Sequence, residues 1–177
     1  MNTAIAIETQ KTMLDWRGRR AALLQTGLAT VAIILPSLCH LWNAPVKVFL
    51  PIHWPVLLAG LVYGWRSGLI IGLLSPLVSF AISGMPGIAS LPAMCLEIGA
   101  YGFAAGFAKE NLKLNDYAAL LGAIVAGRIV YALAIISLFH APLSYAIAAL
   151  IPGLFAAVAQ IALLPTLSKR WTKNKSA

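Results

Sequence analysis

The sequence predicts an all-α integral membrane protein with six transmembrane helices and both termini in the cytoplasm. Hydrophobic residues make up 60% of the 177 residues and charged residues only 10%, whereas a soluble domain carries about 25% charged residues. The apolar residues fall into six runs, and basic residues collect in alternate loops. Long polar stretches occur only at the chain ends. We therefore expect a cytoplasmic segment over 1–19, a six-helix membrane domain over 20–167 and a basic cytoplasmic tail over 168–177.

The six apolar runs differ in length. Four of them are long enough to cross the hydrocarbon core as a helix, which takes about 20 residues. The first lacks a small-x-small cleavage site, so we interpret it as a retained span rather than a signal peptide. The second and third are shorter and are separated by the turn WRSG over 65–68. A re-entrant hairpin would bury Arg66 at membrane depth, so two short spans fit better. The runs cover 20–38, 52–65, 67–82, 90–108, 116–138 and 144–167.

Basic residues orient these spans. In a six-span arrangement eleven Lys and Arg residues fall on the side of the termini, and the opposite loops carry only Lys47. The positive-inside rule then places both termini in the cytoplasm. The net charge of +8 is therefore a topology signal. It lacks the interleaved aromatic residues of a nucleic-acid-binding surface, so we expect no nucleic-acid partner.

Glu97 and Arg128 are the charged residues that lie deepest within the predicted spans. With a rise of 1.5 Å per residue, they lie about 10 Å and about 15 Å below the outer ends of their helices. A charge at such depth is costly and indicates a function. Two compatible interpretations remain open: a buried ion pair that joins the two spans, or a cavity wall in which one or both residues contact a ligand. The guanidinium of Arg128 would suit a carboxylate or an amide.

The residues around these two charges predict a small-molecule pocket. Met94, Glu97 and Tyr101 share one face of a helix, and Tyr131 shares the face of Arg128. An apolar surface with a few polar groups is typical of a ligand pocket, although each Met or Tyr alone could equally be core. The loop SGMPGIASLP over 83–92 cannot be regular helix and is composed like a cover. The candidate binding residues are Glu97, Arg128, Met94, Tyr101, Tyr131, Met85 from this loop, and His53 from the outer end of the second run.

The sequence lacks the motifs of several common catalytic and nucleotide-binding sites. The chain has no GxxxxGK[ST] loop for ATP and no GxSxG or HExxH motif. No two of its acidic residues have the spacing of a metal-binding pair. We expect no enzyme activity, no cofactor and no metal site. The alternatives are an intramembrane enzyme that uses Glu97 as a base and a structural subunit that binds no small molecule.

Small residues recur at every fourth position in several spans, a pattern that lets helices approach closely in lipid. Packing within the bundle explains most of these rows. The row Ala22, Thr26 and Thr30 on the first span could instead face a separate membrane partner.

The stretch over 51–107 resembles the substrate-binding S components of energy-coupling factor (ECF) transporters. The resemblance rests on HWPVLLAGLVYGWRSGLIIGLLSPL over 53–77, SGMP over 83–86 and MCLEIGAYGFAAG over 94–106. The stretch is about a third of the chain. The rest agrees with the family in length, in the six spans and in the cytoplasmic termini.

The resemblance implies a subunit for vitamin uptake. S components bind a vitamin or a metal ion from outside, in a pocket formed by outer loops and the later spans. We accordingly expect a multi-pass protein of the cell's inner (cytoplasmic) membrane, with a pantothenate-like or another small vitamin as its substrate. Cobalamin is an alternative, because His or Cys side chains at the outer mouth could contact its cobalt. The N-terminus MNTAIA lacks the Met-x-His arrangement of nickel and cobalt members, so a metal substrate is not expected.

The resemblance also implies partners. S components associate with a membrane-embedded coupling protein, the T component, and with two cytoplasmic ATPases. The family docks on the coupling protein through an Ala-xxx-Ala face on the first span. The row Ala22, Thr26 and Thr30 approximates that face.

Overall fold

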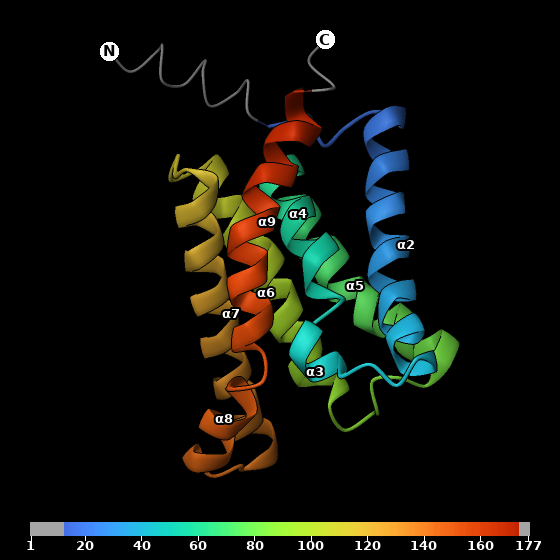
Figure 1. Cartoon of the computed structure of the whole chain (residues 1–177), viewed down its shortest axis with the longest axis vertical. Helices are drawn as coiled ribbons and strands as arrows, with labels where there is room; N and C mark the ends of the chain where they lie inside the picture. The colour runs from blue at the N-terminus through green and yellow to red at the C-terminus, as the bar shows by residue number, and fades with distance from the viewer. Residues whose placement is uncertain (1–12, 174–177) are drawn as a thin grey trace.

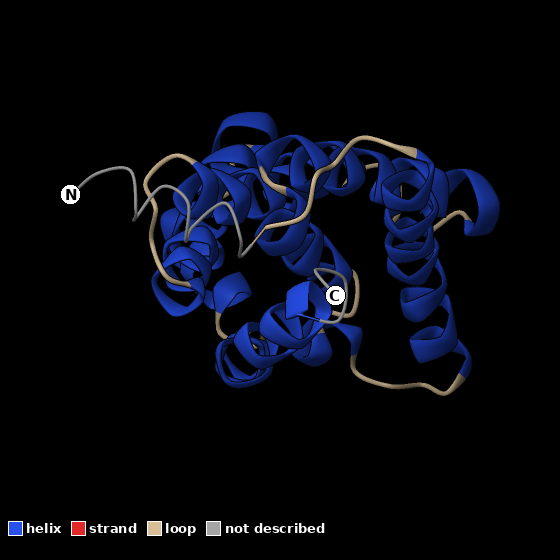
Figure 2. Cartoon of the chain, turned by 90° about the horizontal axis from the view of Figure 1, so that it is seen from above, coloured by secondary structure: helices blue, strands red, loops and turns tan. Residues whose placement is uncertain are grey.

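The described part of the chain is a bundle of helices. The computed structural model describes residues 13–173, so most of the expected segment 1–19 and the end of the expected tail 168–177 lie outside the described residues. Figures 1 and 2 show helices joined by loops, with no strand among the described residues. The helices are α2 (Arg19–Leu41), α3 (Val46–Phe49), α4 (His53–Tyr63), α5 (Trp65–Ser83), α6 (Leu91–Glu110), α7 (Asp116–Phe139), α8 (Leu143–Leu150) and α9 (Leu154–Lys173).

The helices supply the expected membrane spans. Five segments of the described chain are long and apolar enough to cross a membrane, and α8 with α9 forms a bent pair that can serve as a sixth. The all-helical membrane architecture is therefore confirmed. The second and third spans are longer than the runs predicted at 52–65 and 67–82, since they cover Val46–Tyr63 and Trp65–Ser83. The second gains its length from α3, and Gly64 alone separates it from the third.

The sixth span is bent, in contrast to the continuous run predicted over 144–167. Helices α8 and α9 meet at an angle of 43°, and Ile151, Pro152 and Gly153 lie between them. Pro152 ends α8 because it has no N–H for the preceding turn and its ring clashes with the carbonyl four residues earlier. Helix α9 then continues to Lys173, so the first residues of the expected tail are helical.

Both ends of the described chain lie at the same end of the bundle (Figure 1). This terminal end also carries the Gly64 turn and the turn over 111–115 between α6 and α7. The opposite, distal end carries the connection over 42–52 that contains α3, the loop over 84–90 and helix α8. The loop over 84–90 is the Gly- and Pro-containing segment that the sequence predicts as a cover.

Helix α6 is the centre of the bundle and packs against α4, α5 and α7. Its contact with α5 is a glycine seam, in which a Cβ on Gly68 or Gly102 would overlap the backbone of the other residue. Gly72 approaches the backbone of Ile98 in the same way. In lipid, such close backbone packing replaces the hydrophobic effect in holding helices together. The GxxxG spacings at 68–72 and 102–106 carry this signal in the sequence, outside the row discussed above.

Two ion pairs join helices at the terminal end. Lys109 Nζ lies 2.8 Å from Asp116 Oδ1 in a buried pair, and it donates to Ser168 Oγ at 3.3 Å, so that α6, α7 and α9 are tied together. Arg66 Nη1 lies 3.5 Å from Glu110 Oε1 at a half-exposed position. Arg66 therefore lies at an end of the bundle, as two spans require and a re-entrant hairpin does not.

Candidate functional site

Three polar side chains meet inside the bundle toward its distal end. Oε1 of Glu97 on α6 lies 3.7 Å from Nε2 of His53 on α4 and 3.7 Å from Nη1 of Arg128 on α7. His53 and Glu97 are buried, and the side chain of Arg128 is 14% exposed. The Glu97–Arg128 pair, which the sequence left as one of two interpretations, is therefore formed. It extends to His53, whose partner the sequence did not indicate.

The cluster of His53, Glu97 and Arg128 has unused hydrogen-bonding capacity. Within residues 13–173, six buried side-chain nitrogen and oxygen atoms have no hydrogen-bond partner, and four of them belong to His53 and Arg128. These four are Nδ1 and Nε2 of the imidazole and Nε and Nη2 of the guanidinium. A separation of 3.7 Å is too long for a hydrogen bond to Glu97. Since buried polar groups in proteins are nearly always paired, this cluster is suited to a polar ligand.

Tyr101 packs against the imidazole of His53. The two rings meet edge to face, with their centroids 4.8 Å apart and their planes at 77°, a geometry worth about 0.5–1.5 kcal/mol beyond burial. The Tyr101 ring also lies against Gly127 of α7, where a Cβ would come too close to the ring. Tyr101 shares its helix face with Met94 and Glu97, as the sequence predicts. Because it is buried, its contact with His53 positions the imidazole.

The break in the sixth span makes room for Arg128. A Cβ on Gly153 would overlap Nη2 and Cζ of the guanidinium, so a side chain at this position would displace the arginine. Leu50 Cδ1 approaches the same point from the turn between α3 and α4. Leu50 has a left-handed backbone with φ of 46°, which is uncommon for a residue other than glycine. Arg128 is thus enclosed by Glu97, Gly153 and Leu50.

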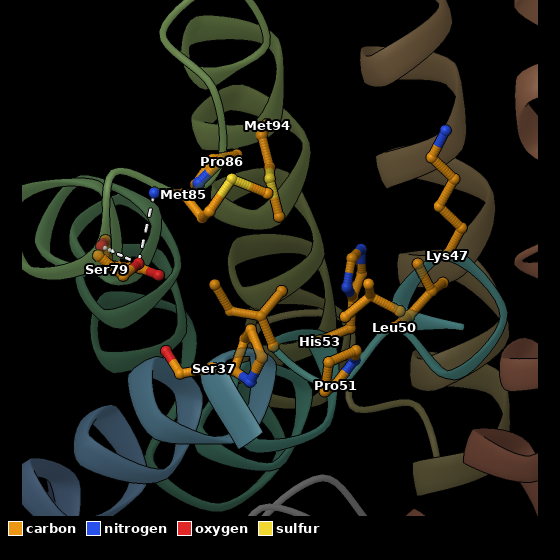
Figure 3. Close-up of a pocket in the computed structure, with 13 residues that line it drawn as sticks. Ser37, Lys47, Leu50, Pro51, His53, Ser79, Met85, Pro86 and Met94 are labelled. Atoms are coloured by element: carbon orange, nitrogen blue, oxygen red, sulfur yellow. Dashed lines mark hydrogen bonds between the residues drawn. The ribbon is translucent and has the colours of Figure 1, made fainter. Parts of the chain in front are cut away.

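A cavity of about 160 Å³ adjoins the cluster at the distal end. His53 is the member of the cluster that lines it, and Leu50 lines it as well. Figure 3 shows Met85, Pro86 and Met94 gathered on one side of this cavity and His53, Leu50 and Lys47 on another. A mostly apolar wall with a few polar groups suits a small ligand. The lining residues are Pro36, Ser37, Val46, Lys47, Leu50, Pro51, Ile52, His53, Ser79, Ser83, Met85, Pro86 and Met94.

A second cavity, of about 430 Å³, lies between the start of α6, the end of α7 and α8. Tyr131 lines it together with two further aromatic residues, Phe139 and Tyr145. None of its lining residues lines the first cavity. Tyr131 is nevertheless close to the polar cluster, because it lies three residues after Arg128 on the same face of α7.

The seven candidate binding residues therefore divide into three groups rather than one pocket. His53, Met85 and Met94 line the first cavity, and Tyr131 lines the second. The remaining three form or support the buried cluster, and they are Glu97, Arg128 and Tyr101.

Two contributors were not predicted. Leu50 lies in a connection that the sequence marks only as a loop. Gly153 belongs to the Ile-Pro-Gly sequence over 151–153, and Pro followed by Gly within an apolar run is the signal that indicates a break there.

The row Ala22, Thr26 and Thr30 lies exposed on α2. Figure 1 shows α2 at the side of the bundle, and only 11% of its most apolar stretch is buried within the described chain. The Thr30 hydroxyl donates to the Thr26 carbonyl at 2.9 Å. This bond satisfies the hydroxyl within the helix, so the row can lie against lipid or another apolar helix.

Comparison with known families agrees with this arrangement. The family model of the ECF transporter substrate-specific component matches residues 25–169. The match includes all of the described helices except the first residues of α2 and the last residues of α9. It includes the whole His53–Glu97–Arg128 cluster. Neither a curated protein nor a solved structure matches the chain. This chain therefore belongs to the family of the substrate-specific components of ECF transporters, which are membrane proteins that bind a small-molecule substrate.

Proposed function

We propose that the chain binds a small water-soluble vitamin, pantothenate-like in size, for uptake by an ECF transporter. One observation carries the proposal. In a family of substrate-binding components, four unpaired buried nitrogen atoms of His53 and Arg128 gather beside a cavity. Leaving buried polar atoms unpaired costs free energy, and a polar ligand that forms hydrogen bonds with these nitrogen atoms would recover it.

The proposed ligand enters from outside the cell, at the distal end. The described basic residues at the terminal end include Arg17, Arg66, Lys113 and Lys169, whereas the distal loops carry Lys47. By the positive-inside rule this distribution supports cytoplasmic termini and an outward-facing cavity. The same argument supports a location in the cytoplasmic membrane, across which a water-soluble vitamin needs a carrier.

The proposed partners are a membrane-embedded coupling protein, the T component, and two cytoplasmic ATPases. Substrate-specific components pair with such a module, and the chain carries no phosphate-binding loop of its own. The exposed row Ala22, Thr26 and Thr30 on α2 is the proposed docking face, because small side chains let a partner helix approach closely.

A small vitamin is better supported than the alternatives. A cavity of about 160 Å³ holds a compact molecule, whereas the corrinoid ring of cobalamin would require the surrounding helices to separate. An enzyme that uses Glu97 as a base is less well supported, because Glu97 is paired with Arg128 and flanked by His53.

Native mass spectrometry of the detergent-purified protein tests the proposal, followed by thermal-shift titration with a panel of water-soluble vitamins. We expect one vitamin to be released on activation or to raise the melting temperature in a dose-dependent way. Arg128→Ala should weaken its binding about 10- to 100-fold, the loss expected for a charged hydrogen-bond donor. Leu121→Ala, on the exposed face of the same helix, should leave the affinity unchanged. Failure of the whole panel to bind the folded protein would contradict the proposal.

A further inference from the structure

One edge of the Arg128 guanidinium is unpaired although it is buried. Glu97 lies beside Nη1, whereas Nε and Nη2 have no hydrogen-bond partner among the described residues. Nε and Nη2 lie on the same edge of the planar group and direct their N–H bonds in parallel. This edge is therefore a two-pronged donor that lacks a hydrogen-bond partner within residues 13–173, although the Tyr101 hydroxyl lies close enough to the guanidinium to interact with it.

A parallel pair of N–H donors on arginine matches the two oxygens of a carboxylate. Such bidentate pairs are the strongest class of protein hydrogen bonds, and a single neutral carbonyl oxygen cannot complete them. Glu97 cancels the charge of Arg128 within the cluster, and Lys47 adds a positive charge on the wall of the adjoining cavity. The surroundings therefore favour a ligand group that carries one negative charge.

Gly153 determines where this edge lies. A Cβ on Gly153 would overlap Nη2 and Cζ, so any other residue would displace the guanidinium from its position. Gly153 immediately precedes α9, and the N-terminal end of a helix carries a partial positive charge. The bend in the sixth span thus brings a second positive group next to the unpaired edge of Arg128. Leu50 approaches the same point and also lines the cavity, so it lies beside both the guanidinium and the cavity.

We propose that the substrate carries a carboxylate, that this carboxylate displaces the Leu50 side chain and binds the Nε–Nη2 edge of Arg128, and that Gly153 is the positioning residue for that edge. The inference rests on the proposed function, since it names the chemical class of ligand for the same site.

Paired acid and neutral vitamins test the inference on the full-length protein in detergent. The probes are pantothenate against panthenol, biotin against biotinol and nicotinate against nicotinamide, with dissociation constants from titration calorimetry. We expect the acid of one pair to bind at least about 100-fold more tightly than its neutral analogue, because the analogue leaves buried donors unpaired. Arg128→Lys, which keeps the charge but loses the parallel donors, should reduce this ratio to about 10 or below.

Gly153→Ala should lower the same acid-to-neutral ratio, a readout that a general loss of stability does not change. Gly122→Ala on α7, where a Cβ meets open space, is the matched control and should leave the ratio unchanged. Should Gly153→Ala fail to fold, the Arg128→Lys ratio decides the question alone.

The outcomes separate the two proposals. Equal binding of acid and neutral forms, or a ratio that Arg128→Lys leaves intact, overturns the carboxylate inference while the vitamin-binding function stands. Absence of binding by every member of the panel overturns both.

Discussion

Nη1 of Arg128 lies 3.7 Å from Oε1 of Glu97 and joins α7 to α6 inside the bundle. The pair meets both interpretations that the sequence leaves open. It is a structural link between two spans, and it still leaves one edge of the guanidinium without a hydrogen-bond partner in the described part of the chain. A purely structural pair would gain most by satisfying all its donors, since unpaired buried groups are costly.

Substitutions of Glu97 and Arg128 should have non-additive effects on the free energy of unfolding of the protein. Glu97→Leu leaves the Arg128 charge buried without a counter-ion, and we expect it to destabilise the protein by about 3–5 kcal/mol. The double variant Glu97→Leu/Arg128→Met removes both charges and should be more stable than that single variant. Chemical unfolding in detergent measures both. Additive effects of Glu97→Leu and Arg128→Met would show that the two charges do not interact.

His53→Phe should separate binding from stability. Phenylalanine keeps the edge-to-face contact with Tyr101 but removes both unpaired ring nitrogens. We expect about 10- to 100-fold weaker vitamin binding, since hydrogen bonds to the ligand are lost, and a melting temperature without ligand that is no lower than that of the wild type. Titration calorimetry and thermal unfolding measure the two quantities.

The control for this variant is Leu138→Met, a volume-conserving change at an exposed residue of α7 that is not among the residues lining either cavity. It should alter the affinity little. Wild-type affinity in His53→Phe would exclude the imidazole from the binding site.

Gly102→Ala should destabilise the bundle, because a Cβ there would overlap the backbone of Gly68. Overpacking in a tight core costs about 1–3 kcal/mol or more. Gly122→Ala adds the same methyl group to α7 where nothing lies within 4 Å, and it should be neutral or stabilising because alanine favours helix. Thermal unfolding of the two variants side by side measures the difference. Similar melting temperatures would show that the seam between α5 and α6 is looser than described.

Thr26→Trp should prevent assembly without affecting the ligand site. Thr26 lies in the exposed row on α2, away from the cavity-lining residues, and a bulky ring would keep a partner helix at a distance. We expect loss of co-purification with the coupling protein and ATPases, together with unchanged vitamin binding. Leu121→Trp, at an exposed residue of α7, is the control and should still assemble. The reverse pattern would move the docking face from α2 to α7.

The sequence predicts the membrane spans and the residues that share a helix face, but not the contacts between helices. Hydropathy indicates the spans because lipid excludes unpaired backbone and charge, and helical spacing brings Met94, Glu97 and Tyr101 to one face. The spacing of residues within one helix gives no information on the distances between residues of different helices. For that reason the sequence could not pair His53 with Glu97, nor assign Tyr131 to a different cavity from Met94. The bend at Gly153 depends on a Pro-Gly signal that a hydropathy average conceals.

We propose that a small vitamin binds at the His53–Glu97–Arg128 cluster through the adjoining cavity. An experimental structure of the protein with the vitamin that it binds most tightly tests this claim most directly. We expect a polar group of the ligand within hydrogen-bonding distance of Arg128 and His53, with Met85 and Met94 along its apolar part. A ligand confined to the cavity lined by Phe139 and Tyr145, with the Arg128 edge still unpaired, would contradict it.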